Sequence, residues 1–305
     1  MGNKLFFKVK TLTFLSSLLF ISLNLTACST NTILTKQTKC PDIPIDALAS
    51  ISQWGSLVKQ VGGQCVNVNS IISSTNVEPH DYEPTANDIG KFSQSKLIII
   101  NGANYDQWAL KAAEQSNINP QIINIAKINN LKDGDNPHLF YSISAIKKTI
   151  KTITNQLINL NRNLSDYFTQ NSLIIAKSYN DLQTKITQTK TKLNNKKVLV
   201  TESVADYLLN ELGLINITPK GYLQSASNEG EISANDINQY TKLLEGKQAD
   251  LLVENIQEQN NTTDKLISIA TANKIKIVQV TEQIPEQYTT INLWLDNIVD
   301  QIASS

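Results

Sequence analysis

Only two histidines occur among the 305 residues, and each directly follows a proline. His80 lies in the stretch NVEPHDYEPT, and His138 lies in NPHLF. Three glutamates stand where apolar, strand-like stretches end: Glu202 closes KKVLVTE, Glu254 closes ADLLVE and Glu282 closes KIKIVQVTE. Neutral imidazole and ionised carboxylate are both deprotonated donors near neutral pH, so these residue types can hold a divalent cation. Two histidines and two glutamates would also balance the charge of one dication.

The two prolines constrain the loops that carry the histidines. Proline fixes its own φ and restricts the residue before it, here Glu78 and Asn136, to extended conformations. A loop that is already restrained loses less entropy when it captures a ligand. Taken singly, each histidine is also compatible with an ordinary polar loop residue, so the residues alone leave both interpretations open.

Strands and helices must alternate along the chain to position these donors, and the apolar pattern predicts that they do, as in an α/β fold with mostly parallel sheets. In the first half we expect strands at 42–49, 66–73, 96–101 and 121–125, with helices near 52–61, 87–94 and 105–115. In the second half we expect strands at 197–201, 222–225, 249–253 and 275–281, with helices near 203–212, 233–244 and 262–272. Ligands of open parallel sheets bind at the carboxyl ends of strands. The histidines of the first half should therefore face the carboxylates of the second half across a cleft.

The middle of the chain is helical. Apolar residues recur at steps of three and four over 142–162, and a second stretch over 164–193 contains no proline or glycine. Thirty helical residues span roughly 45 Å at about 1.5 Å per residue, which exceeds one small domain. We expect this helix to join two lobes; two consecutive surface helices of one domain are the alternative.

The first residues predict a location outside the cytoplasm. Lysines precede an apolar run over 12–25, which has the length and charge asymmetry of a signal peptide. The run ends in LTAC, which resembles the lipobox of bacterial lipoproteins, where the cysteine, here Cys28, is lipidated. We expect a signal peptide over 1–27 and a lipidated tether over 28–40. An ordinary signal peptide with an incidental cysteine is the alternative.

Two further cysteines, Cys40 and Cys65, fall in a compartment where disulfides persist. Each precedes an expected strand, so the two thiols can meet if the strands are parallel neighbours. A loop of about 25 residues closed in this way would contribute roughly 3 kcal/mol of stability. Two buried free thiols are the alternative.

Composition excludes several functions. Lys+Arg 27 balances Asp+Glu 27, so the positive charge expected of a nucleic-acid-binding protein is missing. The local signatures of phosphate loops, dinucleotide folds, zincins and nucleophile elbows are also missing from the sequence.

Several motifs together resemble the zinc/manganese-type solute-binding proteins of ABC importers. They are NVEPHDYEPTANDI, SKLIIINGANYDQW, NPHLF, VTESVADYLLNELGL, NEGEISANDI and VTEQIP, and the likeness runs from about Ile51 to Leu295. The resemblance implies two Rossmann-like α/β lobes joined by a long α-helix, with one metal in the interlobe cleft. It implies four metal ligands: His80, His138, Glu202 and Glu282.

Some positions depart from the family pattern. Glu202 stands where many relatives carry histidine, and the segment that resembles EPSA reads EISA over 231–234. A His-rich or acidic metal-scavenging loop, which many zinc members carry, is missing from the sequence. The identity of the metal, Zn²⁺ or Mn²⁺, therefore stays open, as does any assisting role of Glu254, Glu229 or Glu231.

The expected protein is a monomeric, lipid-anchored receptor on the extracytoplasmic side of a membrane, and it is not an enzyme. It would capture Zn²⁺ or Mn²⁺ and deliver the ion to a membrane permease driven by a cytoplasmic ATPase. The expected division is an N-terminal lobe over 41–162, a connecting helix over 163–194 and a C-terminal lobe over 195–305. Two alternatives are an envelope metal-dependent hydrolase, which needs an open coordination position, and an adhesin or structural lipoprotein with a vestigial cleft.

Overall fold

The computed structural model describes residue 2, residues 39–228 and residues 230–304. The predicted signal peptide, Cys28 and nearly all of the tether lie outside the described residues. The part of the chain from residue 39 onward is compact, and it alone is considered below. In this part of the chain, no helix is both long and apolar enough to cross a membrane.

Two four-stranded parallel sheets form the framework. The first contains β1 (Ile45–Ile51), β2 (Val66–Ile72), β3 (Leu97–Ile100) and β4 (Gln121–Asn124), in the order β2-β1-β3-β4. The second contains β5 (Lys197–Val200), β6 (Ile215–Asn216), β7 (Leu251–Asn255) and β8 (Lys276–Val280), in the order β6-β5-β7-β8. Both sheets have the same strand order, and the predicted fold of two parallel α/β lobes is confirmed.

The helices lie close to the predicted ranges. The first sheet is accompanied by α1 (Ser52–Gly62), α2 (Ala86–Phe92), α3 (Gln107–Glu114), α4 (Ile125–Ile128) and α5 (Ile143–Leu160). The second is accompanied by α7 (Asp206–Glu211), α8 (Lys220–Ala226), α9 (Ala234–Glu245), α10 (Asn261–Ala272) and α11 (Ile291–Ala303). Side-chain oxygens of the preceding residue cap several of them: Thr85, Ser142, Ser233, Asn260 and Thr290 each accept a backbone N–H of the first turn.

The prediction of a strand at 222–225 is wrong, because these residues belong to the helix α8. Tyr222 is completely buried there, and its ring lies 4.7 Å from that of Tyr240 on α9. The strand of this region is β6, which is only two residues long and lies a few residues before the predicted range. It pairs with β5. Pro219 follows it and precedes the first helical residue, where proline favours helix initiation over further strand pairing.

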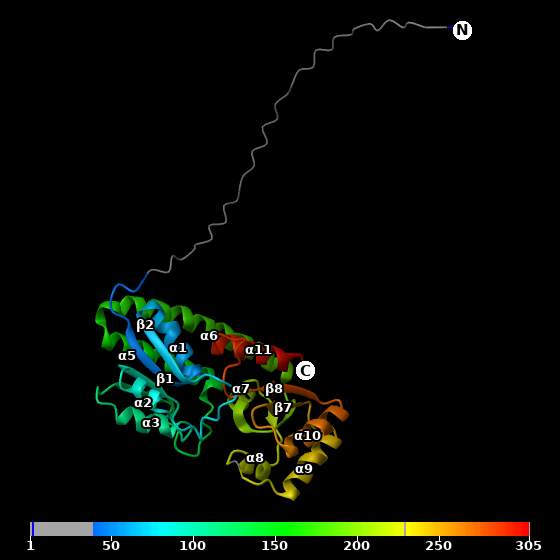
Figure 1. The fold of residues 1–305 in the computed structure, drawn as a ribbon. Helices are drawn as coiled ribbons and strands as arrows, with labels where there is room; N and C mark the ends of the chain where they lie inside the picture. Colours follow the sequence, from blue (N-terminus) through cyan, green and yellow to red (C-terminus); the bar gives the residue numbers. More distant parts are fainter. Residues whose placement is uncertain (1, 3–38, 229, 305) are drawn as a thin grey trace. The chain divides into compact units, whose positions relative to one another are not determined.

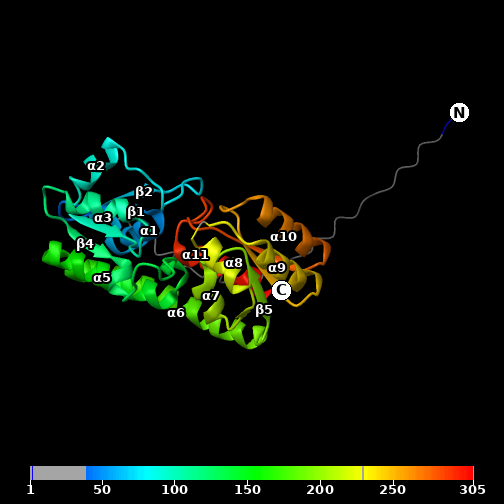
Figure 2. The same ribbon diagram turned by 90° about the horizontal axis from the view of Figure 1, so that it is seen from below.

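The long helix α6 (Ser165–Leu193) packs on both lobes. Figures 1 and 2 show it running beside α5, and it also contacts α1 of the first lobe and α7 and α11 of the second. One continuous apolar core extends from Ile45 in β1 to Ile302 in α11. Within that core the ring of Trp294 lies 4.9 Å from the ring of Tyr141 in the other half of the chain. The two lobes therefore share a packed apolar interface, and this interface opposes large hinge motions.

The structure joins Cys40 to Cys65 in a disulfide, with Cα atoms 5.0 Å apart. Cys65 directly precedes β2, and Ile45 at the start of β1 pairs with Val66 at the start of β2. The expected disulfide is thus present, at the amino-terminal end of the first sheet.

Candidate metal centre

A cleft of about 390 Å³ opens at the carboxyl ends of the strands and is lined by residues of both lobes. Among the described residues that line it are six carboxylates and two imidazoles, and no lysine or arginine: Glu78, Asp135, Glu202, Asp206, Glu258, Glu282, His80 and His138. A low-dielectric cleft lined with one sign of charge attracts ions of the opposite sign. Its electrostatics therefore favour a cation.

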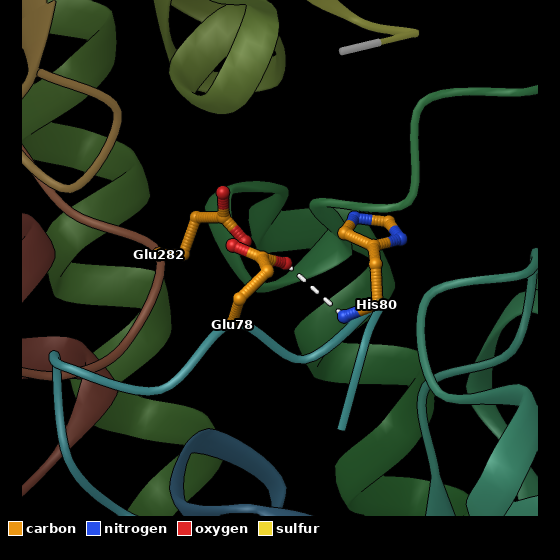
Figure 3. A group of neighbouring side chains, drawn as sticks. All are labelled: Glu78, His80 and Glu282. Carbon is orange, nitrogen blue, oxygen red and sulfur yellow. Dashed lines mark hydrogen bonds between the residues drawn. The ribbon is translucent and has the colours of Figure 1, made fainter. Parts of the chain in front are cut away.

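All four donors predicted from the sequence lie in this cleft, in two overlapping groups. Ligand atoms of His138, Glu202 and Glu282 lie within 4.8 Å of one another. Ligand atoms of His80 and Glu282 lie within the same distance of one another and of a carboxylate oxygen of Glu78 (Figure 3). Glu282 belongs to both groups, so it is the side chain around which the other donors gather.

His138 is oriented by its own loop. Its ring Nδ1 lies 2.8 Å from Asn136 Oδ1, which also accepts the His138 backbone N–H at 3.0 Å. Because an amide oxygen only accepts, Nδ1 carries a proton, so Nε2 is the nitrogen that has the lone pair when the imidazole is neutral. That Nε2 is buried, has no hydrogen-bond partner among the described residues and lies 3.7 Å from Glu282 Oε2. In the neutral ring, the nitrogen that could bond a metal therefore lies beside the Glu282 carboxylate, and both residues line the cleft.

Glu282 is held from three sides. Tyr105 O–H donates to its Oε2 at 2.8 Å, Gln257 Oε1 accepts its backbone N–H at 2.6 Å, and Gln53 Nε2 donates to its carbonyl oxygen. Burial raises the pKa of the Glu282 carboxyl, but the neighbouring His138 imidazole and the Tyr105 hydroxyl outweigh burial and hold that pKa below its usual value. The carboxylate is therefore ionised and ready to bind a cation.

Glu202 follows β5 and belongs to the same buried group. Asn255 Nδ2 donates to its Oε2 at 2.7 Å. Burial, followed by the negative charge of Glu282, raises the pKa of Glu202 to about 7. Burial also raises the pKa of Asp206, another residue that lines the cleft, to about 6. Burial alone would lower the pKa of His138, but the Glu282 carboxylate outweighs burial and raises that pKa above its usual value. A dication would displace the shared protons of this group.

His80 is exposed at the mouth of the cleft. Its ring packs edge-on against Tyr105, with ring centroids 4.8 Å apart. Pro79 is buried, and Trp108 Nε1 donates to its carbonyl oxygen at 2.9 Å. The Pro-His pair is therefore anchored through the proline while the imidazole stays accessible.

Hydrogen bonds connect the lobes around the site. Asn136 Nδ2 donates to the Ser203 carbonyl oxygen at 2.7 Å, and Tyr207 O–H donates to the Asn136 carbonyl oxygen at 2.8 Å. Gln257 Nε2 donates to the Thr75 carbonyl oxygen at 2.8 Å, so the loop that carries His80 is tied to the second lobe. These hydrogen bonds link the loops of the two lobes around the cleft.

The other carboxylates considered from the sequence are not brought into these groups. Glu254 is buried but bonded to Gln259 Nε2 and Gln279 Nε2, at 3.2 and 3.1 Å. Glu231 is exposed, and Glu229 lies outside the described residues. Glu78, which belongs to one of the two groups, was not selected from the sequence. Its only signal there is its position two residues before His80 in the same loop.

The fold and the cleft define a class: two-lobed solute-binding proteins in which donors from both lobes converge on one site. The chain belongs to the family described as zinc-uptake complex component A, periplasmic, which it matches over residues 48–305. The family match confirms the predicted resemblance. It also confirms the prediction of a solute-binding protein that is not an enzyme, because the members of this family are solute-binding proteins. The family description also agrees with the expected location in the cell envelope.

Two relatives illustrate the range of the family. The chain is 27% identical to the high-affinity zinc uptake system protein ZnuA of Bacillus subtilis over 183 residues. This matched stretch covers 53% of this chain and 57% of that protein. It is 25% identical to the manganese ABC transporter substrate-binding lipoprotein PsaA of Streptococcus mitis over 287 residues. That match covers 85% of this chain and 89% of PsaA. Among solved structures, the periplasmic zinc binding protein TroA from Treponema pallidum superimposes with a TM-score of 0.73 at 15% identity, over 86% of this chain and 99% of TroA. That likeness supports the shared fold.

Proposed function

We propose that the protein is an extracytoplasmic solute-binding protein that captures Zn²⁺ or Mn²⁺ for an ABC importer and delivers the ion to a membrane permease driven by a cytoplasmic ATPase. The observation that carries the proposal is the buried His138 Nε2, which faces the Glu282 carboxylate at 3.7 Å without a hydrogen-bond partner among the described residues. Leaving such an atom unsatisfied costs free energy, and a bound cation would satisfy it.

The proposed ligands are His80 and His138 from the first lobe and Glu202 and Glu282 from the second. Two nitrogens and two or more oxygens suit Mn²⁺ by hardness, whereas the general order of affinities favours Zn²⁺. The relatives whose names mention zinc and manganese support both ions as candidates. We expect tighter binding of Zn²⁺ in vitro, whichever ion is transported in the cell.

Binding would join the lobes without a large closure. The ion would bond donors from both sheets, while the shared apolar core and α6 keep the lobes in contact. Movements would then be limited to the loops that carry the donors, chiefly the exposed loop of His80. The permease would recognise that local change.

The mature receptor would be anchored to the membrane by its first residue, Cys28. Residues 1–27 would be removed as a signal peptide, Cys28 would carry the lipid anchor, and residues 28–40 would tether the receptor to the membrane. The mature chain would consist of an N-terminal lobe over 41–162, a connecting helix over 163–194 and a C-terminal lobe over 195–305. It would act as a monomer. Nucleic acid would have no part in its function.

Metal analysis and titration of the mature protein test the proposal. We expect one bound ion per chain in the native sequence, and its loss in both His80→Ala and His138→Ala. Glu231→Ala, which changes an exposed carboxylate outside the two donor groups, is the control and should bind normally. Unchanged binding in the histidine variants would reject the site. Only weak surface binding by the native protein would favour the adhesin or structural lipoprotein.

A further inference from the structure

Glu78 reaches the candidate metal centre from the same loop as His80. One of its carboxylate oxygens lies within 4.8 Å of ligand atoms of both His80 and Glu282. Figure 3 shows the Glu78 and Glu282 carboxylates side by side, although the two residues come from opposite lobes. Glu78 also lines the cleft itself. It therefore meets the same geometric condition as the four donors identified from the sequence.

The loop holds Glu78 in this position. Its Oε1 accepts the backbone N–H of His80 at 3.1 Å, which fixes the carboxylate beside the imidazole (Figure 3). Pro79 between them is buried and bonded through its carbonyl oxygen to Trp108. The buried proline holds the loop against the first lobe, and the side chains on either side of it, Glu78 and His80, both line the cleft. A carboxylate has two oxygens and about four acceptor sites, so it can accept the His80 N–H and bind a cation at the same time.

The charges favour a cation between these carboxylates. Glu78 and Glu282 repel one another at this separation, and Glu202 adds a third carboxylate to the same cleft. A second observation comes from a residue that is not acidic: the buried His138 Nε2 lies 3.7 Å from Oε2 of Glu282, the carboxylate shared by both groups, and has no hydrogen-bond partner among the described residues. A dication at Glu282 would relieve the repulsion and satisfy that nitrogen together.

We propose that Glu78 is a fifth protein donor to the metal. The inference rests on the proposed function, since it concerns the same ion. Five donors, three of them carboxylates, exceed the four that Zn²⁺ takes in tetrahedral protein sites, whereas Mn²⁺ accepts more oxygen ligands. Glu78 therefore raises the affinity for Mn²⁺ more than that for Zn²⁺ and narrows the intrinsic preference for zinc.

The test compares Glu78→Gln with Glu83→Gln. Glutamine keeps an oxygen for the His80 N–H but loses the charge. Glu83 belongs to the same loop, is exposed and is not among the residues that line the cleft, so its variant makes the same change in net charge away from the site. Each protein is titrated with Zn²⁺ and with Mn²⁺ by chelator competition, and each is loaded with Co²⁺ for visible absorption, which is more intense for four-coordinate than for five- or six-coordinate cobalt.

We expect Glu78→Gln to lower the affinity for Mn²⁺ by about 10- to 100-fold, the range typical of lost groups at metal sites. The affinity for Zn²⁺ should fall by a clearly smaller factor, and the cobalt absorption should intensify, while Glu83→Gln resembles the native protein. Equal effects of the two variants, with an unchanged cobalt spectrum, would overturn the role of Glu78 and leave the proposed function intact. Failure of the native protein to bind any of the three ions would overturn both.

Discussion

The Tyr105 hydroxyl donates a hydrogen bond of 2.8 Å to Glu282 Oε2 across the two lobes, and both residues are buried. The first lobe thereby orients the carboxylate around which the donors of both lobes gather. Loss of this bond would leave a buried, charged carboxylate with one partner fewer.

Tyr105→Phe is therefore expected to lower the metal affinity by about tenfold and to destabilise the metal-free protein by about 1–3 kcal/mol. Titration and thermal unfolding measure the two effects. Tyr240→Phe is the matched control, because the Tyr240 hydroxyl is buried without a hydrogen-bond partner among the described residues. Similar losses in both variants would show that the hydroxyl of Tyr105 has no special relation to Glu282.

Metal affinity should fall as the pH is lowered from 8 to 6. His138, whose pKa is raised by the Glu282 carboxylate against the effect of burial, and Glu202, whose pKa is about 7, must both lose protons before they bind a cation. Each proton released weakens binding by about tenfold per pH unit below the pKa concerned. Calorimetry in buffers of different ionisation enthalpy counts these protons, and Glu202→Gln should release one fewer. A constant affinity over this range would argue against ligation by His138 and Glu202.

The metal-free protein should show the opposite dependence of stability on pH. The folded-state pKa values of His138 and Glu202 are both raised, so the folded state binds these protons more tightly than the unfolded state does. The contribution of His138 is complete below about 6.5 and is lost as the pH rises through its folded pKa. That of Glu202 declines between about 4.5 and 7. Glu282, with a lowered pKa, acts in the opposite direction, but only in more acidic solution.

Thermal unfolding should therefore give a higher melting temperature at pH 6 than at pH 8 without metal. With saturating metal the order should reverse, because binding is stronger at pH 8 and adds about 2.7 kcal/mol at 100 times the dissociation constant. The chelated protein in matched buffers is the control. The same order with and without metal would contradict the assignment of the shared protons to the binding site.

The sequence predicted which side chains meet in the cleft better than it predicted the details of the fold. His80, His138, Glu202 and Glu282 all line the cleft, because the loops at the carboxyl ends of parallel strands meet at one edge of the sheet. The same rule also selected Glu254, which lies outside both groups, and the family resemblance was needed to choose the four. The helix α8 was missed because a tyrosine and a leucine beside a short strand suit either state, and only the burial of Tyr222 against α9 decides between them. Local pattern carries no information of that kind.

Contacts between residues distant in the chain account for what was missed at the site. The division of the donors into two groups around Glu282, and the approach of Glu78 to that carboxylate, depend on how the lobes pack. Asn136 offered no signal beyond standing before a proline, yet it orients His138 and bonds the second lobe. Such roles follow from tertiary structure, whereas residue type and strand position were enough to place His80, His138, Glu202 and Glu282 in one cleft.

The disulfide should support stability without affecting the site. Replacing Cys40 and Cys65 by serine removes a link between residues 25 positions apart, which is expected to cost about 3 kcal/mol. Denaturant unfolding of the metal-free protein measures this cost. Metal affinity should be unchanged, because the bridge lies at the amino-terminal end of the first sheet and the donors lie at the carboxyl ends. A matching loss of affinity would contradict that separation.

Gln257 is expected to control how long the ion stays bound. Its side chain bonds the Thr75 carbonyl oxygen in the loop of His80 and the backbone N–H of Glu282, at 2.8 and 2.6 Å, so one residue holds ligand-bearing segments of both lobes. Gln257→Met keeps the length of the side chain but removes these two bonds, together with those to the side chain and backbone N–H of Gln283. It should lower the affinity by about tenfold, mainly through faster dissociation. Stopped-flow chelator competition measures this rate, with Gln188→Met on the exposed face of α6 as the control. An unchanged dissociation rate would mean that the two loops hold the ion independently of this link.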